Sequence, residues 1–216
     1  TVLRKADISD EILYYKPDNS DRSNPSLSEL RDINEDVCAW LSIDNTNIDY
    51  PVLQGKSNSE YLNISIEKEY SLGGSIFLDY RNNSDFTDRY SLIYGHHMSG
   101  GLMFGDISKF SDEDYFSEHR TGWLYVTGKT YQLEIFAFME VDAYASIMLS
   151  IPENDEDIDM LFRRIEDTAK YYEQTEITVD DRVVALSTCT EGTTNGRSIL
   201  VALMIETQNA GGEAKG

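Results

Sequence analysis

Cysteine is scarce in this chain of 216 residues, which contains only Cys38 and Cys189. Two thiols do not make the dense disulfide framework of a small secreted domain. Neither cysteine belongs to a CxxC pair or to a Cys/His cluster with the spacing of a zinc site. No apolar run reaches the roughly 18 residues that a membrane-spanning helix requires. The sequence therefore excludes a disulfide scaffold, a zinc-finger fold and a spanning helix within this stretch.

Basic residues are also few, with 18 Lys and Arg against 39 Asp and Glu and a net charge of −21. A surface of this sign repels phosphate, which argues against nucleic acid and against an anionic bilayer as partners. Apart from that exclusion, the acidity is explained by solubility. The chain begins at Thr1 rather than Met. We therefore expect a processed or shortened form, so the absence of a signal or anchor segment is uninformative.

Helical periodicity occurs near the start of the chain, in residues 10–16 and more clearly in residues 26–41. Ser26 and Glu29 have the spacing of a capping box at the start of the second segment. Apolar residues then recur at helical spacing and predict one buried stripe: Leu27, Leu30, Ile33, Val37 and Leu41. Cys38 lies beside this stripe, so we interpret it as a buried packing thiol.

Most of the remaining chain has short β-like runs separated by turn residues. The predicted strands lie within 47–54, 73–80, 89–96, 182–189 and 197–206, with a hairpin over 122–141 that turns at Gly128-Lys129. One amphipathic helix, over 155–174, interrupts them. The acidic segment 153–159 at its start lacks the ligand pattern of an EF-hand, so we interpret its charges as favourable to a helix N-terminus.

These elements predict a mainly β protein with peripheral helices, an α+β fold built on a closed or nearly closed barrel. The helices precede the strands at the N-terminus, and one more lies in the loop before the strand that carries Cys189. We expect a polar, helical extension over 1–25, one domain over 26–206 and a disordered tail over 207–216.

A nucleophilic cysteine requires a group that favours its thiolate, and that group is usually an imidazole. The chain has three histidines, His96, His97 and His119. His96 follows a glycine at the end of an apolar run, where a scaffold can present it to a groove. His97 would face the other way if the strand continued, because side chains alternate. His119 lies in a charged stretch and is expected at the surface.

Arg197 lies eight residues after Cys189, across a glycine-containing loop. If the flanking strands are neighbours, the loop returns Arg197 to the thiol, where a forked guanidinium suits an oxyanion or a substrate carbonyl. The plainer alternatives are a surface ion pair for Arg197 and a packed core thiol for Cys189. Spacing alone leaves the two interpretations open.

The combination of motifs resembles the sortase family, and most of all its class B branch. "LSTC" is followed by an arginine eight residues after the cysteine, and "YGHHM" lies roughly ninety residues upstream. Further similar stretches include "AWLSIDNTNIDYPVLQ", "GGSIFLDYRN" and "LIYGHHMSGGLMFGDI", and the likeness covers residues 26–206. The helix before the cysteine strand fits class B as well, since class A enzymes lack it.

The resemblance implies a sortase-like closed β-barrel and a cysteine transpeptidase with His96, Cys189 and Arg197 as its catalytic residues. It places four further residues against the substrate peptide: Ser187, Tyr94, Asn58 and Leu62. Thr190 departs from class B members that have an acidic residue after the cysteine, so the exact sorting motif is not implied. No cofactor and no metal are implied.

The resemblance also implies the partners and the location. Such enzymes cleave a sorting motif near the C-terminus of a secreted protein, form a thioacyl intermediate and transfer the acyl group to an amine. The amine belongs to the peptidoglycan precursor, or to a pilin lysine in a pilin-polymerising sortase. The enzyme would act on the outer face of a Gram-positive cell, anchored through a segment N-terminal to this chain. Two alternatives stay open: a cysteine protease that uses water, and a non-catalytic surface-binding barrel.

Overall fold

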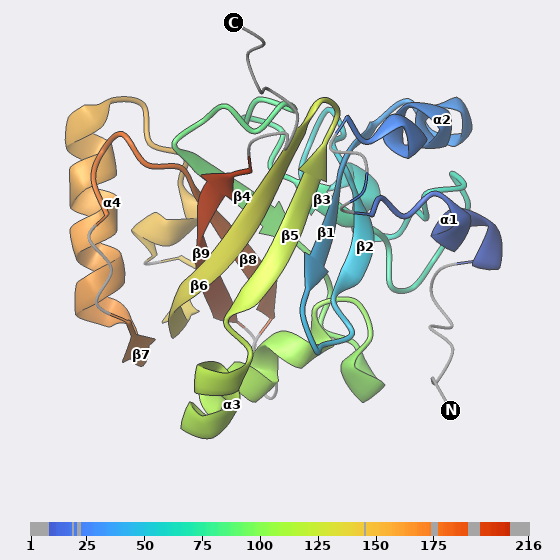
Figure 1. Ribbon diagram of the computed structural model, residues 1–216. Helices are drawn as coiled ribbons and strands as arrows, with labels where there is room; N and C mark the ends of the chain where they lie inside the picture. Colours follow the sequence, from blue (N-terminus) through green and yellow to red (C-terminus); the bar gives the residue numbers. More distant parts are fainter. Residues whose placement is uncertain are drawn as a thin grey trace, which may run out of the picture.

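The centre of the molecule is a closed β-barrel (Figure 1). The structure, a computed structural model, describes residues 9–18, 20, 23–144, 146–173, 177–189 and 195–207, and describes Cys189 by its backbone alone. Within these ranges, eight strands follow one another around the barrel in the order β5-β1-β2-β3-β4-β8-β9-β6, and β6 pairs back with β5 to close it. A ninth strand, β7, extends the free edge of β6. The predicted barrel is confirmed.

The strands are β1 (Val37–Ile43), β2 (Asp49–Leu53), β3 (Ile76–Leu78), β4 (Tyr90–Tyr94), β5 (Thr121–Val126), β6 (Lys129–Asp142), β7 (Tyr171–Tyr172), β8 (Val183–Cys189) and β9 (Gly196–Glu206). The α-helices are α1 (Asp10–Tyr14), α2 (Pro25–Ile33), α3 (Glu113–Glu118) and α4 (Asp155–Thr168). Short 3-10 helices are η1 (Glu60–Leu62), η2 (Ser99–Gly101), η3 (Gly105–Ser111) and η4 (Ile147–Leu149).

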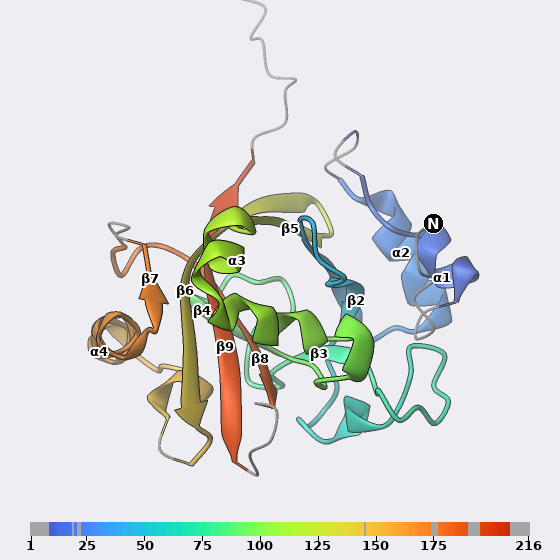
Figure 2. The same cartoon turned by 90° about the horizontal axis from the view of Figure 1, so that it is seen from below.

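Side chains on the barrel strands alternate between the interior and the outer face, and helices cover that outer face at two places. On β8, Val184 and Leu186 belong to the interior core, whereas Val183 and Ala185 pack in the cluster that contains Ile158 of α4. A third cluster joins α1 and α2 to the outer faces of β1, β2, β3 and β5. The helices α2 and α4 therefore lie on opposite sides of the barrel (Figures 1 and 2).

The helix predicted over 26–41 is wrong in its second half, because α2 ends at Ile33 and residues 37–43 form β1. Val37 and Trp40 face the cluster under α2, while Ala39 and Leu41 face the barrel interior. A strand buried on both faces is apolar at nearly every position. Apolar residues of β1, such as Val37 and Leu41, therefore fell by chance at positions that continued the helical spacing of α2.

The predicted capping box at Ser26 and Glu29 is also wrong. The helix begins one residue earlier, at Pro25, and its N-cap is Asn24 in a left-handed conformation without a side-chain cap hydrogen bond. The amide nitrogen of the Asn24 side chain instead donates to the Val126 and Lys129 carbonyls, at 2.8 and 2.9 Å. Asn24 thus anchors α2 to the β5–β6 hairpin. Proline at the first helical position has no N–H and therefore needs no capping acceptor.

Other boundaries differ less from the prediction. The helix α4 ends at Thr168 rather than at 174, because β7 follows it, in which Tyr171 pairs with Phe138 and Tyr172 pairs with Ala137. The β5–β6 hairpin turns one residue before the predicted Gly128-Lys129, since Lys129 already pairs with Val126. Thr190 and nearly all of the tail predicted over 207–216 lie outside the described residues.

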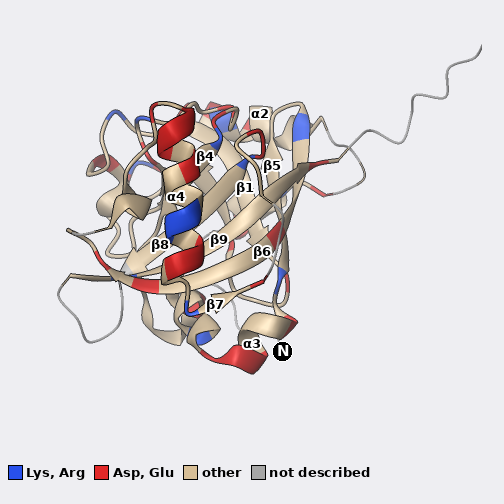
Figure 3. Cartoon of the chain, turned by 90° about the vertical axis from the view of Figure 1, so that its left-hand side faces the viewer, with Lys and Arg blue, Asp and Glu red and all other residues tan. Residues whose placement is uncertain are grey.

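The acidic segment caps α4, as predicted (Figure 3). Asp155, Glu156 and Asp157 occupy its first turn, and the Asn154 side chain accepts a hydrogen bond from the Asp157 amide at 3.0 Å. Negative charge at this end favours the helix dipole. In the described part of the chain, no helix combines the length and the apolar character needed to span a membrane.

Candidate active site

A pocket of about 310 Å³ opens at the end of the barrel where β4, β8 and β9 finish or begin. Six residues predicted for the site line it: Asn58, Leu62, Tyr94, His96, Ser187 and Arg197. The other lining residues are Phe77, Gly95, Ala143, Leu149 and Thr188, which the sequence analysis did not single out. Residues far apart in the sequence thus converge on one concave surface, the usual form of a small binding site.

The strand β8 contributes Ser187 and Thr188 to the pocket and lies between β4 and β9, which contribute Tyr94 and Arg197. On one side it pairs in parallel with β4, so Tyr94 is the register partner of Ser187, and the Gly95 amide donates to the Ser187 carbonyl at 3.2 Å. On the other side it pairs with β9, and Cys189 is the register partner of Arg197. The backbone of Cys189 therefore lies beside Arg197, two residues beyond the pocket-lining Ser187.

His96 contacts the pocket and is held from behind by the backbone. Its Nε2 lies 2.7 Å from the Leu62 carbonyl oxygen. Because a carbonyl only accepts, Nε2 carries the hydrogen in this contact, and the neutral ring then has Nδ1 as its free acceptor. A backbone carbonyl thus takes the place of the acid in a Ser-His-Asp triad, for which the sequence had offered no candidate.

The other two histidines do not line this pocket. His97 forms an isolated bridge with Met103, and its buried Nε2 has no partner among the described residues. His119 stacks on Tyr115, with ring centroids 3.8 Å apart, and its Nδ1 lies 2.9 Å from the Tyr115 carbonyl oxygen. His119 is therefore half-buried by α3 rather than freely exposed, but it lies outside the site, as predicted.

Arg197 is available to the pocket. Its Nη1 donates to the adjacent Gly196 carbonyl at 2.9 Å, and within the described ranges no carboxylate pairs with the guanidinium. The surface ion pair considered as an alternative for Arg197 is thus not formed there. A half-buried guanidinium without a counter-ion suits a carbonyl oxygen that gains negative charge.

Two hydroxyls in the pocket wall have no hydrogen-bond partner in the described part of the chain. Ser187 and Thr188 are 1% and 2% exposed, and neither hydroxyl oxygen has a hydrogen-bond partner among the described residues. Buried polar groups without partners are uncommon in folded proteins, and a bound ligand is one way to satisfy them. No set of three or more His, Cys, Asp and Glu side chains in the described ranges is grouped to hold a metal ion.

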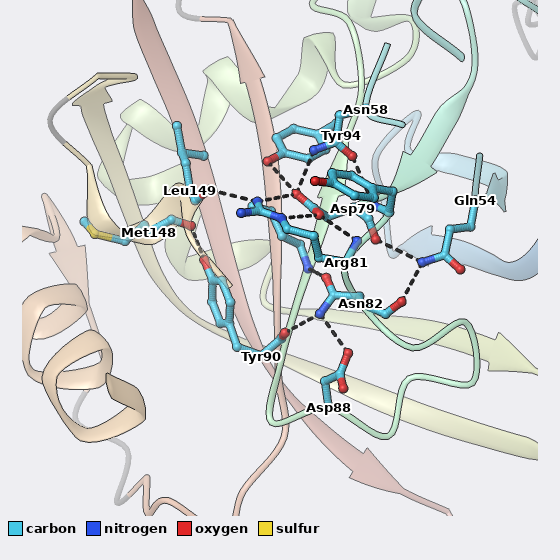
Figure 4. Close-up of polar contacts among 12 residues, drawn as sticks. Gln54, Asn58, Asp79, Arg81, Asn82, Asp88, Tyr90, Tyr94, Met148 and Leu149 are labelled. Carbon is cyan, nitrogen blue, oxygen red and sulfur yellow. Dashed lines mark hydrogen bonds and ion pairs between the residues drawn. The ribbon is translucent and has the colours of Figure 1, made fainter. Parts of the chain in front are cut away.

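A buried carboxylate behind the pocket was missed by the sequence analysis (Figure 4). The Oδ2 atom of Asp79 accepts from Asn58 Nδ2 at 2.8 Å and from the Tyr94 hydroxyl at 3.1 Å. Burial alone would raise the pKa of Asp79, but hydrogen bonds from Arg81 and Asn58 outweigh it and lower that pKa. Burial and the neighbouring Asp79 raise the pKa of Tyr94, which therefore stays a hydrogen-bond donor.

The other cysteine, Cys38, has the burial, the hydrogen bonding and the pKa of a packed thiol rather than of a nucleophile. Cys38 is a free thiol, 3% exposed in the barrel wall, and its Sγ donates to the Val52 carbonyl at 3.3 Å. Burial raises its pKa to about 12. The thiolate is therefore suppressed at neutral pH. The interpretation of Cys38 as a packing thiol is confirmed.

Gly74 supports the contact between His96 and Leu62. It has φ +57°, and a Cβ there would lie 2.4 Å from the carbonyl oxygens of Tyr61 and Leu62. We expect Gly74→Ala to cost about 2 kcal/mol or more, since the left-handed backbone alone costs about 1–2 kcal/mol for a residue with a Cβ. In the peptide cleavage that the resemblance implies, displacing the Leu62 carbonyl should also lower kcat/KM about tenfold. Thermal unfolding and peptide-cleavage kinetics measure the two effects.

Gly128 provides the matched control, because its φ is +78° and a Cβ there meets nothing within 4 Å. Gly128→Ala should carry only the backbone cost and leave cleavage unchanged. Equal losses of activity in both variants would show that Gly74 acts through stability rather than through the Leu62 carbonyl.

Comparison with known proteins agrees with the fold. A model of the sortase domain matches residues 41–205. Sortase B of Listeria monocytogenes is 39% identical over 165 residues, which are 76% of this chain and 66% of that protein. The chain thus spans just under two thirds of the length of this relative.

Two solved structures extend the comparison. The Staphylococcus aureus sortase B-substrate complex matches with a TM-score of 0.79 and 30% identity, covering 85% of this chain and 86% of that one. A Streptococcus pyogenes class B sortase involved in pilus biogenesis matches with a TM-score of 0.74 and 40% identity, covering 82% and 96%. Sortases of this kind are cysteine transpeptidases. The family model matches most of this chain, and the chain shares its barrel with these structures. This chain therefore belongs to the sortase family, in its class B branch.

Proposed function

We propose that this protein cleaves a C-terminal sorting motif of secreted proteins and transfers the acyl fragment to an amine, with Cys189 as nucleophile, His96 as acid and base, and Arg197 as oxyanion donor. The observation that carries the proposal is the pocket itself. It gathers His96 and Arg197 at the end of the strand in which Cys189 is the register partner of Arg197. We assign the catalytic domain to residues 26–206.

Strand alternation supports the role of Cys189. On β8, Val183 and Ala185 pack in the outer-face cluster, and on β9 Ile199 and Val201 do the same. Residues two apart on a strand share a face. By the same alternation, we propose that the side chain of Cys189 shares the face of Arg197, on which the pocket opens.

The first half of the reaction forms a thioester. The Cys189 thiolate attacks the scissile carbonyl carbon, and the electron pair of the C=O bond moves to oxygen, where the guanidinium of Arg197 donates hydrogen bonds. The tetrahedral intermediate then collapses, the C–N bond breaks, and the leaving amine takes a proton from the imidazolium of His96. Because Nε2–H is engaged by the Leu62 carbonyl, we assign this proton to Nδ1.

The second half reverses the proton transfer. The neutral ring of His96 accepts a proton on Nδ1 from the incoming amine, whose nitrogen attacks the thioester carbonyl. An amide forms and the Cys189 thiolate leaves. The imidazole is then protonated and the thiolate is free, so the site has returned to its starting state without a cofactor.

The proposed partners follow from the relatives. A solved sortase B is bound to substrate, and another is complexed with a glycine tripeptide. These complexes support a sorting-motif peptide as donor and a peptide amine as acceptor, which we assign to the peptidoglycan precursor. A pilin lysine is the alternative acceptor, favoured by the similarity to a sortase of pilus biogenesis.

Four pocket-lining residues are proposed to contact the sorting peptide: Asn58, Leu62, Tyr94 and Ser187. We propose that the protein acts on the outer face of a Gram-positive cell, anchored N-terminally.

Product analysis tests this proposal against a cysteine protease that uses water. A peptide carrying the sorting motif, identified first from a peptide library by mass, should give mainly the free acid without added amine. Adding triglycine should divert the product to the amide, in proportion to the amine concentration. Peptide acid as the sole product at every amine concentration would identify a protease, and intact peptide throughout would refute both activities.

A further inference from the structure

A charged pair, Asp79 and Arg81, lies behind the pocket wall and belongs neither to the catalytic assignment nor to the substrate-contacting residues. Asp79 follows directly after β3, and its carboxylate is fully buried. It accepts five hydrogen bonds, from Asn58 Nδ2, the Tyr94 hydroxyl, and the backbone N, Nε and Nη2 of Arg81. The two bonds from the guanidinium side chain, at 2.8 and 2.7 Å, form a bidentate pair. Such charge-assisted bonds are about twice as strong as neutral ones.

The Asn58 and Tyr94 donors come from separate parts of the chain that meet at the pocket. Asn58 precedes η1, Tyr94 ends β4, and both side chains line the pocket. Arg81 Nη2 also reaches toward the Leu149 carbonyl of η4, at 3.5 Å, and Leu149 lines the same pocket. Figure 4 shows the guanidinium between Asp79 and η4. One ion pair therefore connects three walls of the pocket.

The pair also fixes which atom of each wall residue can face a ligand. Asn58 donates from Nδ2 to Asp79 and accepts the Tyr80 backbone N–H on Oδ1 at 3.0 Å, so its amide cannot flip without losing both bonds. Tyr94 can only donate to an ionised carboxylate, so its oxygen keeps its lone pairs for another partner. Both orientations depend on the charge of Asp79.

The backbone of Asp79 is anchored independently of this side chain. Its N–H donates to the Leu92 carbonyl at 2.8 Å, and its own carbonyl accepts from Gln54 Nε2 at 2.9 Å. Conservative changes of the carboxylate should therefore leave the loop in place while releasing the wall residues.

We propose that Asp79 and Arg81 form a positioning pair that holds Asn58, Tyr94 and Leu149 in the orientation that binds the sorting peptide. The expected effect on KM rests on the proposed function. The expected effect on the orientation of the wall residues rests only on the contacts described above. The pair does not touch the reacting atoms, so its loss removes binding that is equal in ground and transition states. Such a loss appears in KM rather than in kcat.

The test compares Asp79→Asn and Arg81→Lys with a control, Arg163→Gln, which removes an exposed ion pair on α4. Asp79→Asn should raise KM about tenfold and leave kcat within about threefold, the size expected for lost hydrogen bonds to a charged group. Arg81→Lys keeps the charge but loses the fork, so a smaller rise of about threefold is expected. Arg163→Gln should match wild type.

Two further measurements separate positioning from general destabilisation. In an Asn58→Ala/Tyr94→Phe background, Asp79→Asn should change KM less than about twofold. The two side-chain groups through which Asp79 would act on the peptide are absent there. Amide hydrogen exchange at Tyr80, whose N–H donates to Asn58, should accelerate about tenfold in Asp79→Asn and stay unchanged in Arg163→Gln. The exchange measurement needs no substrate, so it decides the structural claim even if the wild type proves inactive as a transpeptidase.

The proposal is overturned if Asp79→Asn keeps the wild-type KM, or if its tenfold effect persists unchanged in the double-variant background. Unchanged Tyr80 exchange in Asp79→Asn would also overturn it, since Asn58 would then be held by other contacts. If the wild type shows no cleavage while Tyr80 exchange responds as expected, the proposed function fails and the positioning pair stands.

Discussion

Cys189→Ala is expected to abolish both peptide cleavage and amine transfer, with a loss of about four orders of magnitude or more, as for the removal of a covalent nucleophile. The physical reason is that neither His96 nor Arg197 can form the acyl intermediate without the sulfur. The folded structure should be unaffected, because Cys189 lies at the end of β8 beside the pocket. Peptide-cleavage and transfer assays, together with thermal unfolding, measure both effects.

Cys38→Ala is the matched control, since it removes the only other thiol of the chain. Cys38 is fully enclosed in the barrel wall, and its pKa is raised by burial. Losing one buried sulfur should lower stability by about 1 kcal/mol and leave the turnover of the folded protein within about twofold. A folded Cys38→Ala protein without activity, or an active Cys189→Ala protein, would reverse the assignment of the two thiols.

Arg197→Lys is expected to lower kcat by about 10²–10³-fold with normal folding, the range found when one oxyanion donor is removed. Lysine keeps the positive charge, but it lacks the planar fork that can donate two bonds to one carbonyl group. Arg197 has no carboxylate partner within the described ranges, so its replacement breaks no ion pair that holds the fold together there.

Steady-state kinetics of Arg197→Lys with the sorting peptide, alongside its unfolding midpoint, decide this prediction. A loss confined to KM would assign Arg197 to holding the peptide rather than to stabilising the oxyanion. Near-wild-type turnover would remove Arg197 from the mechanism altogether.

Much of the site was predictable because its residues lie at the ends of strongly patterned strands. The run before Cys189 and the run that begins at Arg197 are apolar on both faces, so both strands were predicted from the sequence. Their antiparallel pairing was left open there and is established by the structure. His96 could be placed at the same edge because a glycine ends its strand. Family resemblance then indicated Asn58 and Leu62, which periodicity alone could not connect to the pocket.

Asp79 was not predictable from such patterns. In the sequence it is one of 39 acidic residues, and it follows a strand of three residues. Its burial depends on Asn58 and Tyr94 approaching from other parts of the chain, and no local signal reports such contacts. The single helix predicted over residues 26–41 was wrong for a different reason. The strand β1 is covered by α2 on its outer face and by the core on its inner face. Burial on both faces removed the alternation that would have identified a strand.

A crystal structure of the reduced protein that resolves Cys189 tests the central claim most directly. We predict that the sulfur lies on the pocket side of β8, within about 6 Å of both the His96 ring and the Arg197 guanidinium, the range over which charged groups stabilise one another. A sulfur packed into the apolar interior of the barrel, or a His96 ring turned away from β8, would contradict it.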